Sequence, residues 1–210
     1  MKDLTIAVVG ATGAVGTEFL RIVEQRHRQM PNIKALASSR SAGKRLTIGG
    51  HELVVEETTE DSFAGVDIAF ISVDGDLSRR LGPVAVAAGA VVIDDSSAFR
   101  MREDVPLVVP EVNGADVEWH RGIISIPNCS TTPLAMVAHP LHRVNPIVRI
   151  VADTYQSVSG AGSAPMAELR EQSRDVLEGK KAQPQAITHQ IAFNVIPHID
   201  RFLDDGYTFE

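Results

Sequence analysis

This chain of 210 residues has a single cysteine, Cys129, so it cannot form a disulfide within itself. A lack of disulfides is typical of reducing compartments, and we therefore expect a cytoplasmic location. No apolar run approaches the roughly 18 residues that a membrane-spanning helix needs. Residues 4–9 are already typical of a strand, so no signal peptide is expected before them. These absences predict a soluble protein with no membrane partner.

The chain also lacks an excess of positive charge. Lys and Arg number 20 against 27 Asp and Glu, which gives a formal net charge of −7. Such a charge disfavours nucleic acid or an anionic membrane as the main partner. The sequence shows no internal repeat or low-complexity segment, and its length admits one large domain or two small ones. The composition is that of an ordinary soluble globular protein.

The first third of the chain is predicted to form a dinucleotide-binding fold. An apolar strand-like run over residues 4–9 precedes the loop GATGAVG (10–16), and helical spacing of apolar residues follows over 17–24. Glycines in such a loop let the backbone approach a pyrophosphate, and the helix N-terminus stabilises its charge. A plain tight turn is the alternative, but the order strand, glycine loop, helix favours nucleotide binding.

The second strand expected in this fold, over residues 33–37, does not end in the acidic residue that usually binds the ribose of NAD. The sequence SSRSAGKR (38–45) follows it instead. Hydroxyl groups and a guanidinium suit a 2′-phosphate, which a carboxylate would repel. The sequence therefore favours NADP as the cofactor, and a solvent-exposed basic loop is the alternative.

Strands and helices are predicted to alternate through the middle of the chain, and a different pattern follows. The expected elements are a hairpin over 48–55, strands over 66–72, 91–94 and 122–126, and a helix over 77–88. Further along we expect a long strand over 147–156, a polar helix over 163–178 and an extended segment over 186–197. Long strands with one polar face suit an antiparallel sheet.

The fold class expected from this order is α/β, with two domains. Residues 1–127 are predicted to form a Rossmann-type, doubly wound parallel sheet that binds NADP. Residues 128–210 are predicted to form a partial α+β catalytic and dimerisation domain.

Cys129 is the candidate nucleophile of the chain. A predicted strand ends just before it, and a helical pattern begins with Leu134, so the thiol is expected at a turn near a helix N-terminus. Amide N–H groups and the positive end of the helix dipole favour a thiolate there, and a thiolate attacks carbonyl groups. A buried cysteine that acts as a small apolar residue is the alternative, and the position alone leaves both open.

Seven segments, in the same order along the chain, resemble those of aspartate-semialdehyde dehydrogenase. They are GATGAVG (10–16), SSRSAG (38–43), SSAFR (96–100), VPEVN (109–113), PNCST (127–131), YQSVSGAG (155–162) and HQIAFNVIP (189–197). The resemblance implies reductive dephosphorylation of L-4-aspartyl phosphate to L-aspartate 4-semialdehyde, with NADPH as the reductant and a thioester on the cysteine. This is an early step towards lysine (through diaminopimelate), threonine and methionine. It also implies a homodimer or a higher homo-oligomer.

The resemblance further implies roles for individual residues. Catalytic roles are implied for Cys129 as nucleophile, Asn128 beside it in the phosphate or oxyanion site, and Gln156, which orients the substrate. Arg100 is the expected ligand of the substrate phosphate, and no metal is expected. Contacts to the cofactor are implied for the loop residues Gly10, Thr12, Gly13, Ala14 and Val15, for Arg40 and Ser41 at the 2′-phosphate, and for Ser159 and Gly160 near the nicotinamide.

Members of this family are longer than the chain. Their acid/base histidine, a substrate-binding arginine, and an active-site glutamate and lysine lie beyond the positions present here, and His189 and His198 come too early to replace the histidine. We therefore expect an incomplete copy with slow turnover. Two alternatives stay open. One is an inactive NADP-binding or dimerisation module, and the other is N-acetyl-γ-glutamyl-phosphate reductase, whose cysteine follows a glycine where this chain has Asn128.

Overall fold

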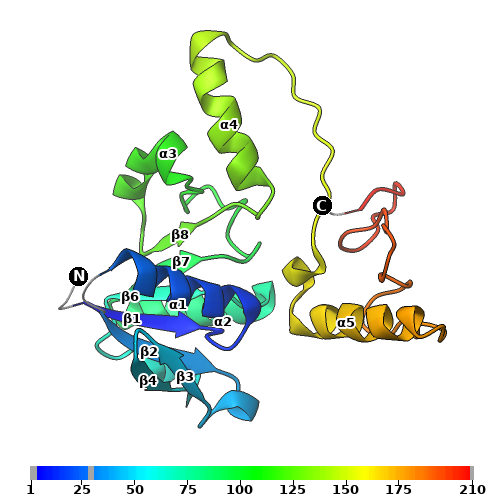
Figure 1. Cartoon of the computed structure of the whole chain (residues 1–210). Helices are drawn as coiled ribbons and strands as arrows, with labels where there is room; N and C mark the ends of the chain where they lie inside the picture. The colour runs from blue at the N-terminus through cyan, green and yellow to red at the C-terminus, as the bar shows by residue number, and fades with distance from the viewer. Residues whose placement is uncertain (1–3, 28–30, 209–210) are drawn as a thin grey trace. The chain divides into compact units, whose positions relative to one another are not determined.

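The computed structural model describes residues 4–27 and 31–208 and divides into two compact units (Figure 1). The first unit is Met1–Tyr155 and the second is Gln156–Glu210. Among the described residues, no helix is both long and apolar enough to cross a lipid bilayer.

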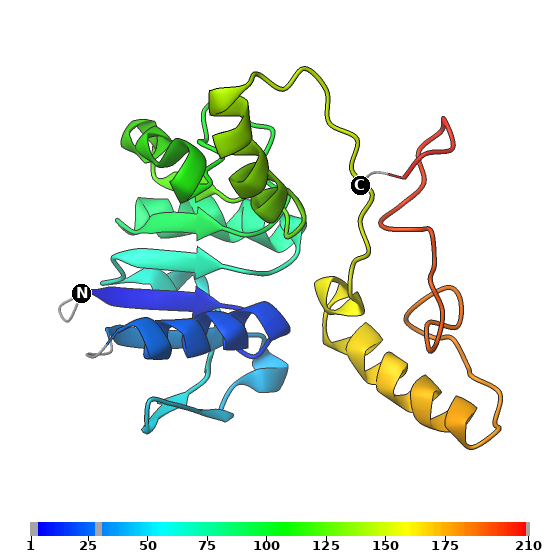
Figure 2. The same ribbon diagram turned by 45° about the horizontal axis from the view of Figure 1, so that its top comes forward.

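A parallel sheet of six strands forms the centre of the first unit. Its strands are β1 (Thr5–Val9), β2 (Asn32–Ala37), β5 (Glu56–Glu57), β6 (Ile68–Ile71), β7 (Val91–Asp94) and β8 (Ile123–Ser125). They lie in the order β5-β2-β1-β6-β7-β8, and the arrowheads of the sheet point the same way in Figure 2. This is the strand order of a doubly wound dinucleotide-binding sheet, in which ligands bind at the carboxyl ends of the strands near the reversal between β1 and β6. The predicted Rossmann-type fold is confirmed.

Alternate residues of β1 face two separate hydrophobic cores. Ile6 and Val8 pack in a cluster with Leu20 of α1 (Ala14–Arg26), whereas Ala7 and Val9 pack in a cluster with Leu81 of α2 (Gly75–Ala87). Because successive side chains of a strand point to opposite faces, the two helices cover opposite sides of the sheet. A strand buried on both faces is continuously apolar, which is why it could be recognised in the sequence.

The remaining elements of the first unit connect and flank the sheet. The predicted hairpin is formed by β3 (Arg45–Ile48) and β4 (His51–Val54), which pair antiparallel. Short helical turns are η1 (Ser39–Ser41), η2 (Glu60–Phe63), α3 (Pro110–Asn113) and η3 (Gly114–Trp119), and a longer helix, α4 (Thr131–Val144), follows Cys129.

The second unit contains one long helix and a segment without regular secondary structure. After the turn η4 (Val158–Ala161) comes α5 (Ser163–Leu177), which confirms the predicted polar helix. Residues 178–208 form bends and turns, with one isolated bridge between Phe202 and Thr208.

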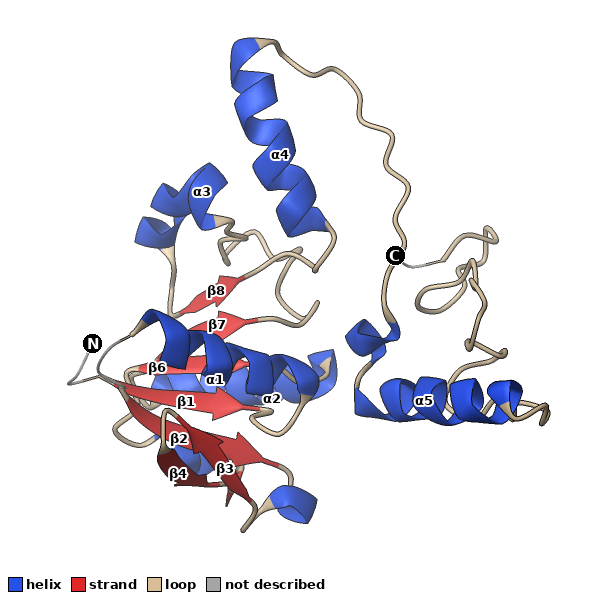
Figure 3. Cartoon of the chain, viewed as in Figure 1, coloured by secondary structure: helices blue, strands red, loops and turns tan. Residues whose placement is uncertain are grey.

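The strand predicted over residues 147–156 is wrong. The chain that leaves α4 is loop throughout this range (Figure 3), and Val148 and Tyr155 are 98% and 88% exposed. A strand is stabilised by hydrogen bonds to a neighbouring strand, and neither sheet of the described residues includes residues 147–156. The alternating apolar residues of this segment therefore do not place it in a sheet.

The extended segment predicted over residues 186–197 is also wrong. This part of the chain bends repeatedly, and Phe193 has a left-handed backbone with φ of 56°. The N–H groups of Ile191 and Ala192 donate to the side chain of Gln172 instead of to a neighbouring strand. A side-chain acceptor on α5 has taken the place of a sheet ladder.

Candidate active site

The glycine loop joins β1 to α1 by a very close approach of backbone to backbone. Gly10 has φ of 86°, and a Cβ atom there would lie 2.2 Å from the carbonyl oxygen of Ser72. A Cβ atom on Gly16 would lie 2.2 Å from the carbonyl oxygen of Gly10. Side chains at either position would push the loop away from the sheet, so the two glycines set the position of the helix N-terminus.

The N-terminus of α1 suits an anion. Its N-cap is Gly13, which has no side chain to satisfy the first N–H groups, and the first turn, all of it described, has no acidic residue. Ala14 and Val15 open this turn, so their backbone lies where a pyrophosphate binds in dinucleotide folds. The residues present fit the predicted contact with the cofactor phosphates.

The turn after β2 lies against the glycine loop. Thr12 Oγ1 donates to Ser41 Oγ at 3.4 Å, and Lys44 Nζ donates to the same hydroxyl at 3.3 Å. Arg40 is exposed in the same turn. The structure thus brings the predicted residues Thr12, Arg40 and Ser41 together. It adds Lys44, which belongs to the same basic run but had no predicted role.

Arg100 is held in place by two backbone carbonyls. Its Nε donates to the oxygen of Ile126 at 2.9 Å, and its Nη2 donates to the oxygen of Asp95 at 2.8 Å. These acceptors directly follow β8 and β7, so the plane of the guanidinium is fixed relative to the sheet edge. Nη1 takes part in neither of these two bonds, so a donor of the guanidinium can still face an anion.

A buried polar network supports the turn that carries Arg100. Asp94 is fully buried and accepts from the hydroxyls of Ser78 and Ser96. Its neighbour Asp95 accepts from Ser72 Oγ at 3.0 Å. Burial raises the pKa of the Asp95 carboxyl, while the Ser72 hydrogen bond and the nearby guanidinium oppose that shift. No role was predicted for these residues from the sequence, because nothing in their spacing marks them.

Cys129 is exposed and lies one residue before Ser130, the N-cap of α4. The expected turn between a strand and a helix N-terminus is confirmed, and the alternative of a buried apolar cysteine does not describe this side chain. Asn128 Oδ1 accepts from the N–H of Thr131, the first residue of the helix, at 2.9 Å. This bond fixes the amide of Asn128 beside the thiol.

The predicted residues of the first unit lie at the carboxyl ends of the parallel strands. Because β1, β7 and β8 are parallel, the glycine loop, Arg100 and Cys129 follow their strands at the same edge. Gln156, Ser159 and Gly160 belong to the second unit. There the last two lie in η4, where Ser159 N–H donates to Ser157 Oγ at 3.4 Å.

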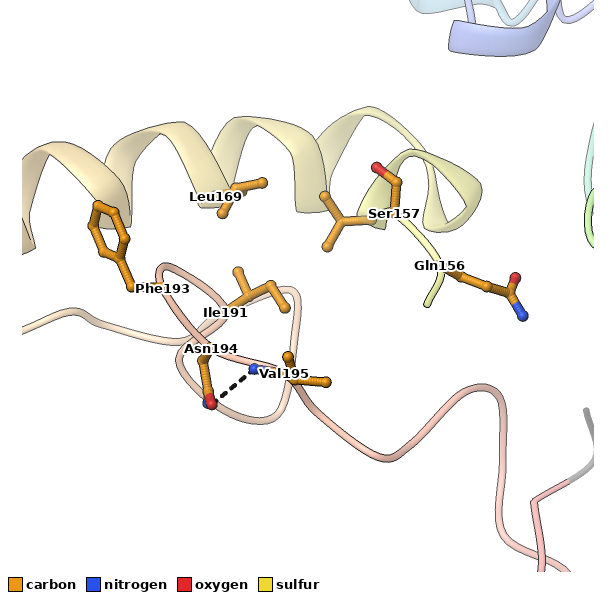
Figure 4. Close-up of a pocket in the computed structure, with 8 residues that line it drawn as sticks. Gln156, Ser157, Leu169, Ile191, Phe193, Asn194 and Val195 are labelled. Atoms are coloured by element: carbon orange, nitrogen blue, oxygen red, sulfur yellow. Dashed lines mark hydrogen bonds between the residues drawn. The ribbon is translucent and has the colours of Figure 1, made fainter. Parts of the chain in front are cut away.

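The second unit contains a cavity of about 660 Å³ (Figure 4). Gln156 lies at one end of the group of lining residues, next to Ser157, and Leu169 of α5 lies opposite Ile191. The cavity is lined by Gln156, Ser157, Val158, Leu169, Ile191, Phe193, Asn194 and Val195. Gln156 is thus one of the residues that line a space large enough for a small metabolite, and its amide points away from Leu169 and Ile191 in Figure 4.

The fold and the glycine loop define a dinucleotide-binding protein. Two family models match the chain: the NAD binding domain of semialdehyde dehydrogenase over residues 5–120, and the semialdehyde dehydrogenase dimerisation domain over residues 139–210. The chain belongs to the semialdehyde dehydrogenase family.

Individual relatives agree with this assignment. Aspartate-semialdehyde dehydrogenase of Bacillus subtilis is 46% identical over 216 residues, which cover 100% of this chain and 62% of the relative. A crystal structure of aspartate semialdehyde dehydrogenase II from Vibrio cholerae, complexed with ASA, has 42% identity and a TM-score of 0.95 and covers 100% of this chain and 63% of that one. The Candida albicans enzyme, solved with NADP, has 29% identity and a TM-score of 0.56 over 69% of this chain and 48% of that one. The chain thus spans about 62% of the length of such a relative.

Proposed function

We propose that this chain carries the cofactor-binding domain and part of the catalytic domain of an NADP-dependent aspartate-semialdehyde dehydrogenase. The reaction is reduction of L-4-aspartyl phosphate to L-aspartate 4-semialdehyde with release of phosphate. One observation carries the proposal: an exposed thiol, Cys129, and a guanidinium held at two points, Arg100, follow strands at the same sheet edge as the dinucleotide loop. Membership of the semialdehyde dehydrogenase family supports reading the thiol as the nucleophile and the guanidinium as the phosphate site.

The cofactor in this proposal is NADP rather than NAD. Thr12, Arg40, Ser41 and Lys44 lie around one point beside the glycine loop, where three of them offer hydroxyl or ammonium donors and Arg40 offers a positive charge. Donors and positive charge favour a 2′-phosphate, and β2 ends without a carboxylate to bind a 2′-hydroxyl. When bound, the reduced cofactor supplies the hydride.

The chain's own residues carry out the transfer of the acyl group. The Cys129 thiolate attacks the carbonyl carbon of the acyl phosphate, the carbon–oxygen bond to phosphate breaks, and a thioester forms at Sγ. Arg100 binds the phosphate and takes up part of its charge as it leaves. Asn128, fixed beside the thiol, donates to the oxygen that becomes negative during the attack. Gln156 orients the substrate.

We also propose a division of the chain at Pro127–Asn128. Residues 1–127 form the cofactor domain, and residues 128–210 belong to the catalytic and dimerisation domain. The family models support this division because they match on either side of it. The dimerisation domain also supports a homodimer or higher homo-oligomer. A biosynthetic role suggests a cytoplasmic location.

Acylation of Cys129 tests the proposal without requiring full turnover. Purified protein is mixed with L-4-aspartyl phosphate, released phosphate is measured, and the protein is analysed by mass spectrometry. We expect one aspartyl group on Cys129 and none on Cys129→Ser. Binding of NADP without acylation would instead favour the inactive cofactor-binding module. Acylation by N-acetyl-γ-glutamyl phosphate in preference to aspartyl phosphate would favour the reductase alternative, which the names of the relatives disfavour.

A further inference from the structure

Two polar side chains one turn apart on α5 are buried together. Glu168 is 8% exposed and Gln172 is 2% exposed. The amide Nε2 of Gln172 donates to Glu168 Oε1 at 2.7 Å. Burial of a carboxylate is costly unless hydrogen bonds compensate for the lost water. The burial of both side chains therefore indicates that their hydrogen bonds hold a particular part of the structure in place.

The pair accepts hydrogen bonds from four backbone N–H groups of one segment. Glu168 accepts from Gln185 at 3.2 Å and from Ala186, and Gln172 Oε1 accepts from Ile191 at 2.9 Å and Ala192 at 3.3 Å. All four donors lie in the part of the chain that forms neither helix nor strand. Side chains of α5 thus satisfy backbone groups that a sheet satisfies elsewhere.

The same contacts set the walls of the cavity beside Gln156. Leu169, next to Glu168 in the helix, lines one side, and Ile191, whose N–H is bonded to Gln172, lines the other. Figure 4 shows these two apolar side chains facing each other, with Val195 further along the same wall. The distance between helix and segment, and so the shape of the cavity, depends on the buried pair.

We propose that Glu168 and Gln172 are positioning residues, which hold residues 185–195 as one wall of a substrate cavity bordered by Gln156. The ligand class is a small amino acid carrying an aldehyde or acyl phosphate. This assignment rests on the proposed role of Gln156 in orienting the substrate. Glu168 suits the task because a carboxylate only accepts hydrogen bonds, and all three of its partners are donors.

Exchanging the two side chains tests the pair. In Glu168→Gln, an NH₂ group replaces one acceptor, and we expect amide hydrogen exchange at Gln185 and Ala186 to quicken about tenfold or more. In Gln172→Glu, two carboxylates meet, and exchange at Ile191 and Ala192 should rise similarly. The double variant E168Q/Q172E restores one donor facing one acceptor. The amide exchange rates of Ile191 and Ala192 should therefore return towards the wild-type values. Such a return would also show that the fold tolerates both substitutions.

Steady-state kinetics then separate positioning from structure alone. With aspartate semialdehyde, NADP⁺ and phosphate, Gln172→Glu should raise KM for the semialdehyde about tenfold and change kcat little, and the double variant should recover KM. The matched control is Glu171→Gln, an exposed residue on the same helix, which should change neither exchange nor KM.

Each other outcome has a defined meaning. Unchanged amide hydrogen exchange in both single variants would show that Glu168 and Gln172 do not hold residues 185–195 in place. Faster exchange with an unchanged KM overturns the positioning role and leaves a structural contact. If L-4-aspartyl phosphate does not acylate Cys129 of the wild-type protein, the proposed function fails. The hydrogen-exchange measurements still decide whether Glu168 and Gln172 hold this segment, because they need no substrate.

Discussion

Arg100 donates from Nη2 to the backbone carbonyl of Asp95 at 2.8 Å, and its charge also acts on the Asp95 carboxyl. Asp95 thus holds the guanidinium through its backbone carbonyl, and the charge of the guanidinium in turn opposes the rise that burial causes in the pKa of the Asp95 carboxyl. Because Nε also donates to the carbonyl of Ile126, the guanidinium cannot rotate without breaking a hydrogen bond. The fixed orientation of Arg100 is therefore a testable part of the proposed phosphate site.

Replacement of Arg100 should impair acylation of Cys129 by L-4-aspartyl phosphate. In Arg100→Ala the leaving phosphate loses its positive partner, and we expect the rate to fall about 100-fold or more. Arg100→Lys should recover little of it, because a lysine cannot reproduce bonds from Nε and Nη2 together with an anion contact. The measurement is single-turnover release of phosphate.

The control for this measurement is Arg102→Ala. Arg102 is paired with Asp104 at the surface, two residues along the chain from Arg100. Its removal should leave acylation within about twofold, because an exposed ion pair contributes little. An equal loss in both variants would contradict a specific role for Arg100.

The turn after β2 should determine the preference for NADP. Arg40→Ala should weaken NADP⁺ binding about tenfold or more and leave NAD⁺ binding nearly unchanged, since only NADP⁺ carries the 2′-phosphate. Lys44→Ala should act in the same direction. Calorimetry with both cofactors measures the difference. Arg45→Ala is the matched control, because Arg45 pairs with Glu52 in the hairpin. Equal weakening of both cofactors would place these residues away from the 2′ position.

The close approach at Gly10 predicts a large loss of stability on substitution. In Gly10→Ala, the new methyl group would meet the Ser72 carbonyl oxygen at 2.2 Å in addition to the strain of a positive φ. Gly89→Ala isolates the strain, because Gly89 has φ of 98° with open space around it. We expect a cost of about 1–2 kcal/mol for Gly89→Ala, and a further cost of at least about 1–3 kcal/mol for Gly10→Ala. Urea unfolding of both variants measures the difference. A similar loss for both would mean that the loop moves aside freely.

The sequence predicted the first unit well because its signals are local. Buried parallel strands such as β1 are short apolar runs, and the glycine loop between strand and helix has its own pattern. The hairpin and the position of Cys129 before a helix followed from the same kind of reasoning. Each of these features depends on neighbouring residues, so periodicity and turn chemistry suffice.

Features that depend on distant partners could not be predicted in this way. The alternation over residues 147–156 indicated a strand, but the pattern carries no information on whether a partner strand is present. Glu168 and Gln172 bind backbone groups 17 to 20 residues away, and no spacing rule connects such positions. Ser72 and Asp95 similarly meet only because the neighbouring strands β6 and β7 end side by side. Single-sequence patterns describe elements, and these contacts arise between elements.

Asp95 predicts a dependence of stability on pH. Burial raises its pKa above the ordinary value of 3.8, so the folded state holds the proton more tightly than the unfolded state does. Below the unfolded value the carboxyl is protonated in both states and costs nothing. As pH rises through the raised folded value, the buried carboxylate becomes charged, and its contribution to stability becomes unfavourable.

Asp95→Asn removes this titration while keeping the shape of the side chain. We therefore expect the free energy of unfolding of the variant, relative to wild type, to increase between about pH 4 and pH 7. Urea unfolding across this range measures the difference, and Asp76→Asn, at an exposed position, is the control variant. A relative stability of Asp95→Asn that falls as pH rises would reverse the sign. It would mean that attraction from Arg100 and the bond from Ser72 outweigh the burial of the carboxylate.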